Sequence, residues 1–324
     1  GMALQARTVD IRHEAGHAAV TVPLPEPLWR KPHFQRMLSR VTMSALRQDH
    51  EGVQCLLGLD DQGQVLTLNL ASPATPHLLV AGTTGAGKTN LLRSMLASLV
   101  LLNAPGQLQI VLIDVKDYEF ETFSNVPHLL YPVVTTPADW PAAVGQVITR
   151  MRERRRAKGQ ARETAPRFLL VIDEVATVLD RYHGLEPALK ELTATGRAEG
   201  CHTILATQKP SAESLSTLIT SNLPARIAGP CASATDARLI TGHPQSGAEK
   251  LPGSGSFLLV TGGGEAQPFT APLVEEQDLT GLLSEVQAQV TYPELHSEAV
   301  AAFIAALERK SGTGRPAKEI EPAV

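Results

Sequence analysis

His77-Leu-Leu-Val-Ala-Gly82-Thr-Thr-Gly-Ala-Gly-Lys88-Thr89-Asn90 is the stretch of this sequence that decides the fold. A short, largely apolar run typical of a buried strand leads into glycine, four residues and Gly-Lys-Thr, which is the phosphate-loop pattern. The glycines allow backbone N–H groups to approach phosphate oxygens, and the helix expected after the loop adds the positive end of its dipole. We expect nucleotide phosphates to be bound by Gly82, Thr83, Thr84, Gly85, Ala86, Gly87, Lys88, Thr89 and Asn90.

Two side chains at the end of this loop would carry its charge chemistry. Lys88 should reach the β- and γ-phosphates of ATP, and the hydroxyl of Thr89 should be a ligand of Mg²⁺. The alternative is a glycine-rich turn that only caps a helix, and the strand and helix patterns on either side favour the nucleotide site.

Two further apolar runs end in polar side chains that suit an ATPase. Residues 168–172 lead into Asp173 and Glu174, where Asp173 would hold Mg²⁺ through water and Glu174 would polarise the attacking water. Residues 203–207 lead into Gln208, whose amide could sense the γ-phosphate or position water. Read without the phosphate loop, the acidic pair could simply end a strand, and a glutamine at a strand end is common.

Short apolar runs alternate with helical patterns from residue 77 onward, which predicts an α/β fold with a mainly parallel sheet. A hairpin is expected before them, from residues 53–59 and 65–70, and residues 3 to about 50 look irregular. The expected strands are residues 77–81, 109–113, 168–172, 203–206, 226–228 and 256–260. The expected helices are residues 89–101, 138–158, 187–198, 214–221 and 294–307.

The amino-acid composition excludes several classes of protein. The chain has 324 residues, 43% of them hydrophobic and 19% charged, which excludes a disordered or fibrous protein. Its most apolar stretch, residues 91–102, is too short and too interrupted to span a bilayer, so no membrane span is expected. Three scattered cysteines indicate reduced thiols, and we expect a cytoplasmic protein. A net charge of −4 means that any nucleic-acid site must be a local patch.

One candidate patch is the basic run at residues 150–158, which carries six positive side chains and one negative one. Such a run is usually a solvated helix end, and tracking of nucleic-acid phosphates is the alternative. Aromatic residues make up only 4% of the chain, which disfavours a platform for stacking single-stranded bases.

A competing motif is His13-Glu-Ala-Gly-His17, which matches the His-Glu-x-x-His signature of zinc proteases. That chemistry needs a helix that places both imidazoles on one face, together with a third ligand. Gly16 weakens a helix, and the residues that follow look like a strand broken by prolines. The sequence therefore disfavours zinc catalysis.

Taken together in order, the motifs resemble those of the FtsK/SpoIIIE family of DNA translocases. The resemblance spans residues 53 to 274, and residues 16–23 resemble a strand of the family's small N-terminal subdomain. Beyond the phosphate loop, the matching segments are Ile113-Asp-Val-Lys116, Pro127-His-Leu-Leu130, Val171-Ile-Asp-Glu174, Gly196-Arg-Ala-Glu-Gly-Cys-His202, Ile204-Leu-Ala-Thr-Gln-Lys-Pro210, residues 218–228 and Gly247-Ala-Glu-Lys-Leu251.

The resemblance implies a RecA-like motor core with ATP and Mg²⁺ as cofactors. It further implies a homo-oligomeric ring, of six subunits in the family, that threads double-stranded DNA largely without regard to sequence. ATP would lie between neighbouring subunits, and Arg197 matches the family's arginine that completes the site of the next subunit. The catalytic residues implied are thus Glu174, Gln208 and Arg197, with Thr89 and Asp173 at the metal.

The resemblance also implies a division of the chain and leaves alternatives. Residues 3–72 would form the small N-terminal subdomain, 73–275 the motor domain, and 276–324 a helical segment with a polar tail. The family's membrane-spanning region and winged-helix module have no counterpart in these residues, so the cellular process stays open. A conjugative coupling or protein-secretion ATPase of the same superfamily is the main alternative, and a nucleotide-gated ring that clamps DNA without moving is a third.

Overall fold

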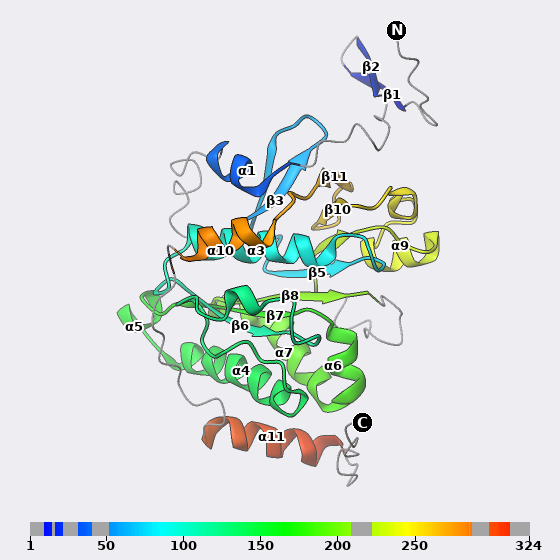
Figure 1. Cartoon of the computed structure of the whole chain (residues 1–324). Coiled ribbons are helices and arrows are strands. Elements are labelled where there is room, and N and C mark those ends of the chain that lie inside the picture. The colour runs from blue at the N-terminus through cyan, green and yellow to red at the C-terminus, as the bar shows by residue number, and fades with distance from the viewer. Residues whose placement is uncertain are drawn as a thin grey trace, which may run out of the picture.

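A computed structural model describes residues 10–14, 17–21, 32–40, 52–208, 222–284, 286 and 298–311. Its centre is a nine-stranded sheet of order β4-β3-β11-β10-β9-β5-β8-β7-β6 (Figure 1). The strands are β3 (Gln54–Asp60), β4 (Val65–Asn69), β5 (His77–Ala81), β6 (Leu108–Ile113), β7 (Arg167–Ile172), β8 (Cys201–Thr207), β9 (Ala225–Ala228), β10 (Ser256–Thr261) and β11 (Gln267–Thr270).

Five adjacent strands, β6, β7, β8, β5 and β9, run parallel, which confirms the predicted α/β class with a mainly parallel sheet. The remaining strands are antiparallel. The run at residues 256–260, expected among the parallel strands, is antiparallel to β9. The chain enters β10 at the edge where β9 ends, since the N–H of Gly255 bonds the carbonyl of Ala86 in the phosphate loop at 3.0 Å. Because β10 begins at this edge of the sheet, it runs in the direction opposite to β9.

Helices cover both faces of the sheet (Figure 1). One core lies between α3 (Lys88–Leu102), α10 (Glu276–Ser284) and one face, and it includes the buried side chains of β3. The other core lies under α4 (Trp140–Arg156), α6 (Val175–Arg181) and α7 (Glu186–Thr195). Strands buried on both faces have no polar side to expose, which explains their continuous apolar runs.

The last described helix, α11 (Glu298–Ser311), packs against α4. The other described α-helices are α1 (Phe34–Arg40), α5 (Gln160–Glu163) and α9 (Ala234–Thr241). Phe303 of α11 fits against Gly145 of α4, where a Cβ would lie 2.6 Å from the phenyl ring. Within the described ranges, no helix has the length and apolarity to cross a bilayer. The helix expected at residues 214–221 falls outside these ranges.

The expected hairpin forms as β3 and β4, but it belongs to the large sheet. β3 pairs with β11, and Gly58 permits the close approach because a Cβ there would lie 2.1 Å from the carbonyl oxygen of Thr270. The expected boundary between residues 72 and 73 therefore lies inside one continuous sheet, and the division of the chain stays a proposal.

The N-terminal region is less irregular than the sequence suggested. β1 (Asp10–Glu14) and β2 (His17–Thr21) form an antiparallel pair, and α1 follows. β2 lies within residues 16–23, where a strand was expected, whereas β1 and the pairing were not predicted. His13 pairs with Ala18, and Glu14 pairs with His17. The two histidines thus lie on different strands rather than on one face of a helix, which is not the geometry of the zinc-protease motif.

Candidate nucleotide site

The predicted site residues gather at the edge of the sheet where the parallel strands end. The phosphate loop joins β5 to α3, Asp173 and Glu174 follow β7, and Gln208 follows β8. A loop of residues 114–120 follows β6 at the same edge. Open parallel sheets bind ligands in the crevice at the carboxyl ends of their strands, which is where these residues lie.

Hydrogen bonds to the segment that follows β9 in the same chain hold the phosphate loop in shape. Thr83 donates to the carbonyl of Pro230 through its N–H at 2.9 Å and through its hydroxyl at 3.1 Å. Gly85 and Gly87 have φ angles of 82° and 92°, which suit glycine. Their N–H groups have no acceptor among the described residues, so they can receive phosphate oxygens. This observation fits a bound nucleotide.

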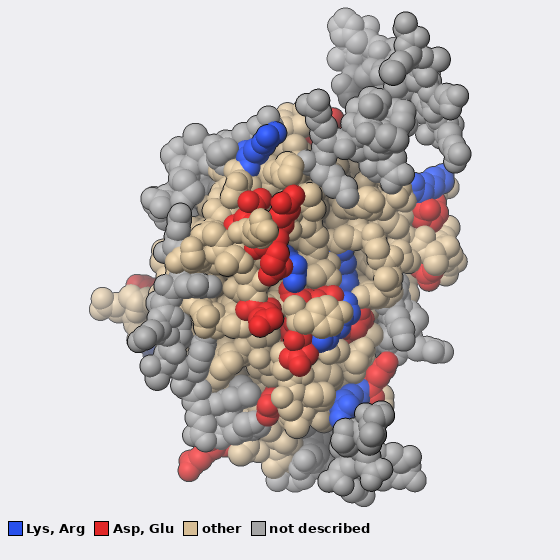
Figure 2. Space-filling model, in the orientation of Figure 1, with Lys and Arg blue, Asp and Glu red and all other residues tan. Residues whose placement is uncertain are grey.

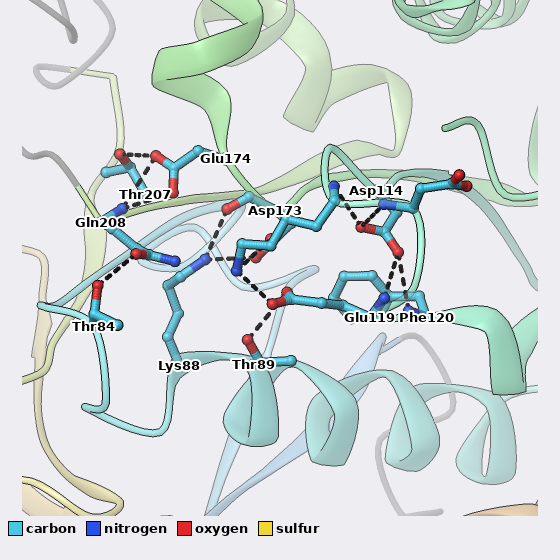
Figure 3. A network of polar contacts seen from close by, with 12 residues as sticks. Thr84, Lys88, Thr89, Asp114, Glu119, Phe120, Asp173, Glu174, Thr207 and Gln208 are labelled. Atoms are coloured by element: carbon cyan, nitrogen blue, oxygen red, sulfur yellow. Dashed lines mark hydrogen bonds and ion pairs between the residues drawn. The ribbon is translucent and has the colours of Figure 1, made fainter. Parts of the chain in front are cut away.

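Lys88 and Asp173 form a buried ion pair behind the loop (Figure 3). The ammonium of Lys88 donates to Asp173 twice, to the carbonyl at 2.9 Å and to Oδ1 at 2.5 Å. Burial, with a contribution from the nearby Glu119 carboxylate, raises the pKa of Asp173 to about 6 despite the attraction of Lys88. Lys88 therefore balances Asp173 here, and it would exchange that partner for phosphates.

Glu174 and Gln208 are joined to each other and to the loop (Figure 3). The Glu174 carboxylate accepts from the Thr207 hydroxyl at 2.5 Å and from the N–H of Gln208 at 3.0 and 3.1 Å. The side-chain oxygen of Gln208 accepts from the Thr84 hydroxyl at 2.9 Å. A shift of the phosphate loop can therefore reach Glu174 through a single side chain.

Asn90, expected among the nucleotide-binding residues, uses its amide elsewhere. It donates to the carbonyl of Pro272 at 2.6 Å and accepts from the N–H of Val274 at 2.9 Å. Its side chain fastens the start of α3 to the segment after β11. Only its backbone is left to face a ligand.

Sequence reasoning missed Glu119. Its carboxylate accepts from the Thr89 hydroxyl at 3.0 Å and from the ammonium of Lys116 (Figure 3). Burial opposes its ionisation, yet its contacts with Asp173, Lys116 and Thr89 keep its pKa below the usual value. The available signal was a third strand ending in a carboxylate, Ile113-Asp114, with another acidic residue in the loop that follows.

Arg197 lies at the opposite edge of the sheet from the phosphate loop of its own chain. It is exposed, in a 3₁₀ turn of residues Gly196–Glu199 just before β8, whereas the far end of β8 contacts Gly82 through Thr207. β8 has seven residues, so about 20 Å separates its ends. Arg197 therefore cannot touch the nucleotide site of its own chain.

The basic run is largely neutralised by acidic neighbours. Arg150 pairs with Glu153 at 3.1 Å and Arg152 with Glu191 at 2.8 Å. Arg155 lies 3.5 Å from Glu199, a buried carboxylate that also pairs with Arg162. Figure 2 shows acidic and basic side chains mixed on the face it presents, without a broad basic surface. The run mainly ties α4 to α7 and to the turn that carries Arg197.

Mg²⁺ fits the oxygen groups around Thr89. The Thr89 hydroxyl and the Asp173 carboxylate supply hard oxygen ligands, the kind that Mg²⁺ prefers beside nucleotide phosphates. Oδ2 of Asp173 is buried without a hydrogen-bond donor in the described part of the chain. A buried carboxylate oxygen without a hydrogen bond is costly, and a metal cation would satisfy it.

Comparison with known proteins places this site in context. Residues 36–162 match the model of the FtsK/SpoIIIE family. The chain is 31% identical over 309 residues to DNA translocase FtsK of Mycobacterium tuberculosis, covering 86% of this chain and 36% of that protein. It is 30% identical over 320 residues to DNA translocase FtsK of Staphylococcus aureus, covering 90% of this chain and 40% of that protein. The chain thus spans less than half the length of either relative.

Solved structures share the fold at lower identity. The cytoplasmic domain of the Type VII secretion ATPase EccC of Thermomonospora curvata superposes with a TM-score of 0.70 at 21% identity, over 82% of this chain and 36% of that one. The pCW3 conjugation coupling protein TcpA, a monomer with ATPγS, gives 0.64 at 18% identity, over 86% and 81% of the two chains. These similarities show a common P-loop ATPase fold.

Proposed function

The chain belongs to the FtsK/SpoIIIE family, and from that premise we propose that it is an ATP-hydrolysing motor that moves double-stranded DNA through a homo-oligomeric ring. The observation that carries the proposal is the convergence of Lys88, Asp173, Glu174 and Gln208 on one phosphate loop. A ring of six and a cytoplasmic location are part of the same proposal.

Each residue has a role that its position supports. Thr89 and Asp173 would hold Mg²⁺, which would supply neutralisation of charge on the β- and γ-phosphates. Lys88 moves from Asp173 to those phosphates. Glu174 polarises the attacking water. Gln208 links the phosphate loop to Glu174, because its side chain contacts Thr84 and its N–H contacts Glu174. The Glu174 carboxylate is bonded to the end of β8 in this structure, so it must turn toward the water as the loop fills.

Conjugative coupling and protein secretion remain the alternative function. Relatives at 30–32% sequence identity are named as DNA translocases, whereas the secretion and coupling ATPases resemble this chain in structure at only 14–21% identity. This difference favours the DNA motor. The test is ATP turnover with and without linear duplex DNA. A rise of tenfold or more is expected with duplex of any sequence, and a rise only with a protein substrate would support the alternative.

Arg197→Ala should bind ATP nearly as well as the parent but lose about 10³-fold or more in hydrolysis, because Arg197 serves the site of the next subunit. The informative experiment mixes Arg197→Ala with Glu174→Gln protein. Neither alone should turn over ATP, but mixed rings contain interfaces with an intact Glu174 and an intact Arg197. ATPase activity should reappear and follow the mixing ratio. No recovery in mixed rings verified by crosslinking would contradict a role across subunits.

A further inference from the structure

The loop after β6 is wound around one buried carboxylate. Asp114 accepts four backbone hydrogen bonds, from the N–H groups of Lys116, Asp117, Glu119 and Phe120 at 2.8–3.2 Å (Figure 3). Asp117 adopts a left-handed φ of 67°, which turns the chain inside this loop. The backbone of the loop is therefore fixed without any help from the side chain of Glu119.

The fixed loop aims the Glu119 carboxylate at the start of α3. Oε2 of Glu119 accepts from the Thr89 hydroxyl at 3.0 Å, and its backbone carbonyl accepts from Nε of Arg93 at 2.7 Å. Its side chain is 8% exposed. A carboxylate buried this far from water needs a cation beside it, and Lys116 supplies one here.

Lys116 lies between two carboxylates. Its ammonium bonds Oε1 of Glu119 and lies 3.9 Å from Oδ2 of Asp173, the oxygen without a hydrogen-bond donor among the described residues. Its side chain is 30% exposed, so it can withdraw toward solvent. Around it stand the Thr89 hydroxyl and the carboxylates of Asp173 and Glu119, a set of hard oxygen groups.

We propose that Glu119 is a further residue of the Mg²⁺ site, and that the Lys116 ammonium takes the place of the metal between Asp173 and Glu119 until nucleotide binds. The inference rests on the proposed ATP site and extends it. The Thr89 hydroxyl donates a hydrogen bond to Glu119, which leaves the lone pairs of its oxygen for the metal. One divalent cation balances the two carboxylates, so Lys116 is then free to leave.

A purely structural Glu119 is the competing explanation, in which its pair with Lys116 only closes the loop. The Asp114 carboxylate already closes that loop through four hydrogen bonds. The two explanations therefore differ in what the metal adds to nucleotide binding, and not in the fold of the loop.

The test compares Glu119→Gln with the parent in titrations of a fluorescent ADP analogue, in EDTA and in Mg²⁺. Affinity in EDTA should stay within about twofold, whereas the gain that Mg²⁺ brings should shrink by about tenfold or more, as for other residues around a metal site. Glu121→Gln is the matched control, because Glu121 is an exposed carboxylate two residues along. An unchanged Mg²⁺ gain in Glu119→Gln would overturn the proposal.

A second variant tests the role of Lys116 without nucleotide. Lys116→Met should bind Mn²⁺ about tenfold more tightly than the parent, measured by electron paramagnetic resonance on nucleotide-free protein. This test stands even if Glu119→Gln does not fold, and equal Mn²⁺ affinity would overturn the exchange. Lys88→Ala distinguishes a failure of this proposal from a failure of the proposed nucleotide site. If Lys88→Ala binds the ADP analogue like the parent, the nucleotide site itself is wrong. If it loses binding, the nucleotide site stands and the other variants test only the roles of Glu119 and Lys116.

Discussion

Lys88→Ala should abolish nucleotide binding and with it all ATP turnover. Lys88 is the cation of the phosphate loop, and its side chain is 4% exposed. The N–H groups of Gly85 and Gly87 in the same loop have no acceptor among the described residues. Alanine would leave the β- and γ-phosphates without their ammonium partner. Titration of a fluorescent ATP analogue checks this. Lys190→Ala is the control, because among the described residues Lys190 pairs with Glu186 of the same helix, outside the site. Binding near the parental affinity would refute the phosphate-loop assignment.

The same variant has a second signature in its stability. Without Lys88, Asp173 is a buried charge without its strongest partner, and breaking such a pair costs about 3–5 kcal/mol. The pKa of Asp173 is already raised to about 6 in the folded protein, so its contribution to stability is greatest below pH 4 and is lost as the pH rises through 6. Removal of Lys88 raises that pKa further. The deficit of Lys88→Ala in denaturant melts should therefore be larger at pH 8 than at pH 5, and an equal deficit would contradict the pairing.

Glu174→Gln should separate binding from hydrolysis. The amide has the same size and keeps an oxygen for the Thr207 hydroxyl and the N–H of Gln208, so ATP should bind. The attacking water loses its base, and the turnover rate should fall by about 10³-fold. Rapid-quench measurement of a single turnover, beside slow release of labelled ATP, checks this.

Glu186→Gln provides the comparison for that experiment, because Glu186 is a partly exposed carboxylate of α7, outside the site. It should turn over ATP like the parent. Parental turnover by Glu174→Gln itself would move the catalytic base to another residue.

The elements of the fold could be predicted where the residues that determine them are consecutive in the sequence. The strand, loop and helix of residues 77–102 are written in consecutive residues, and β5 spans His77–Ala81 as predicted. The partners of β3 and β10 could not be predicted in this way. They depend on close approaches such as Gly58 to Thr270 and Gly255 to Ala86, which join segments far apart in the chain.

The site residues that could be predicted are likewise those with a local signal in the sequence. Asp173, Glu174 and Gln208 each follow a buried strand directly, and the structure brings them to the phosphate loop, although their roles stay predictions. Glu119 sits five residues beyond Asp114, in a loop whose shape comes from that buried carboxylate, and it meets Thr89 across thirty positions. The basic run of α4 looked free because Glu191 and Glu199 lie some forty positions away.

In the proposed function, ATP hydrolysis moves this protein along duplex DNA. The most direct measurement is displacement of a fluorescent third strand from a triplex at one end of a linear duplex, with ATP turnover recorded in parallel. We expect ATP-dependent release, a lag that lengthens with the duplex between entry and triplex, and no release by Glu174→Gln. DNA-stimulated ATP turnover that leaves the triplex in place would show a clamp or a different substrate, and translocation would then be refuted.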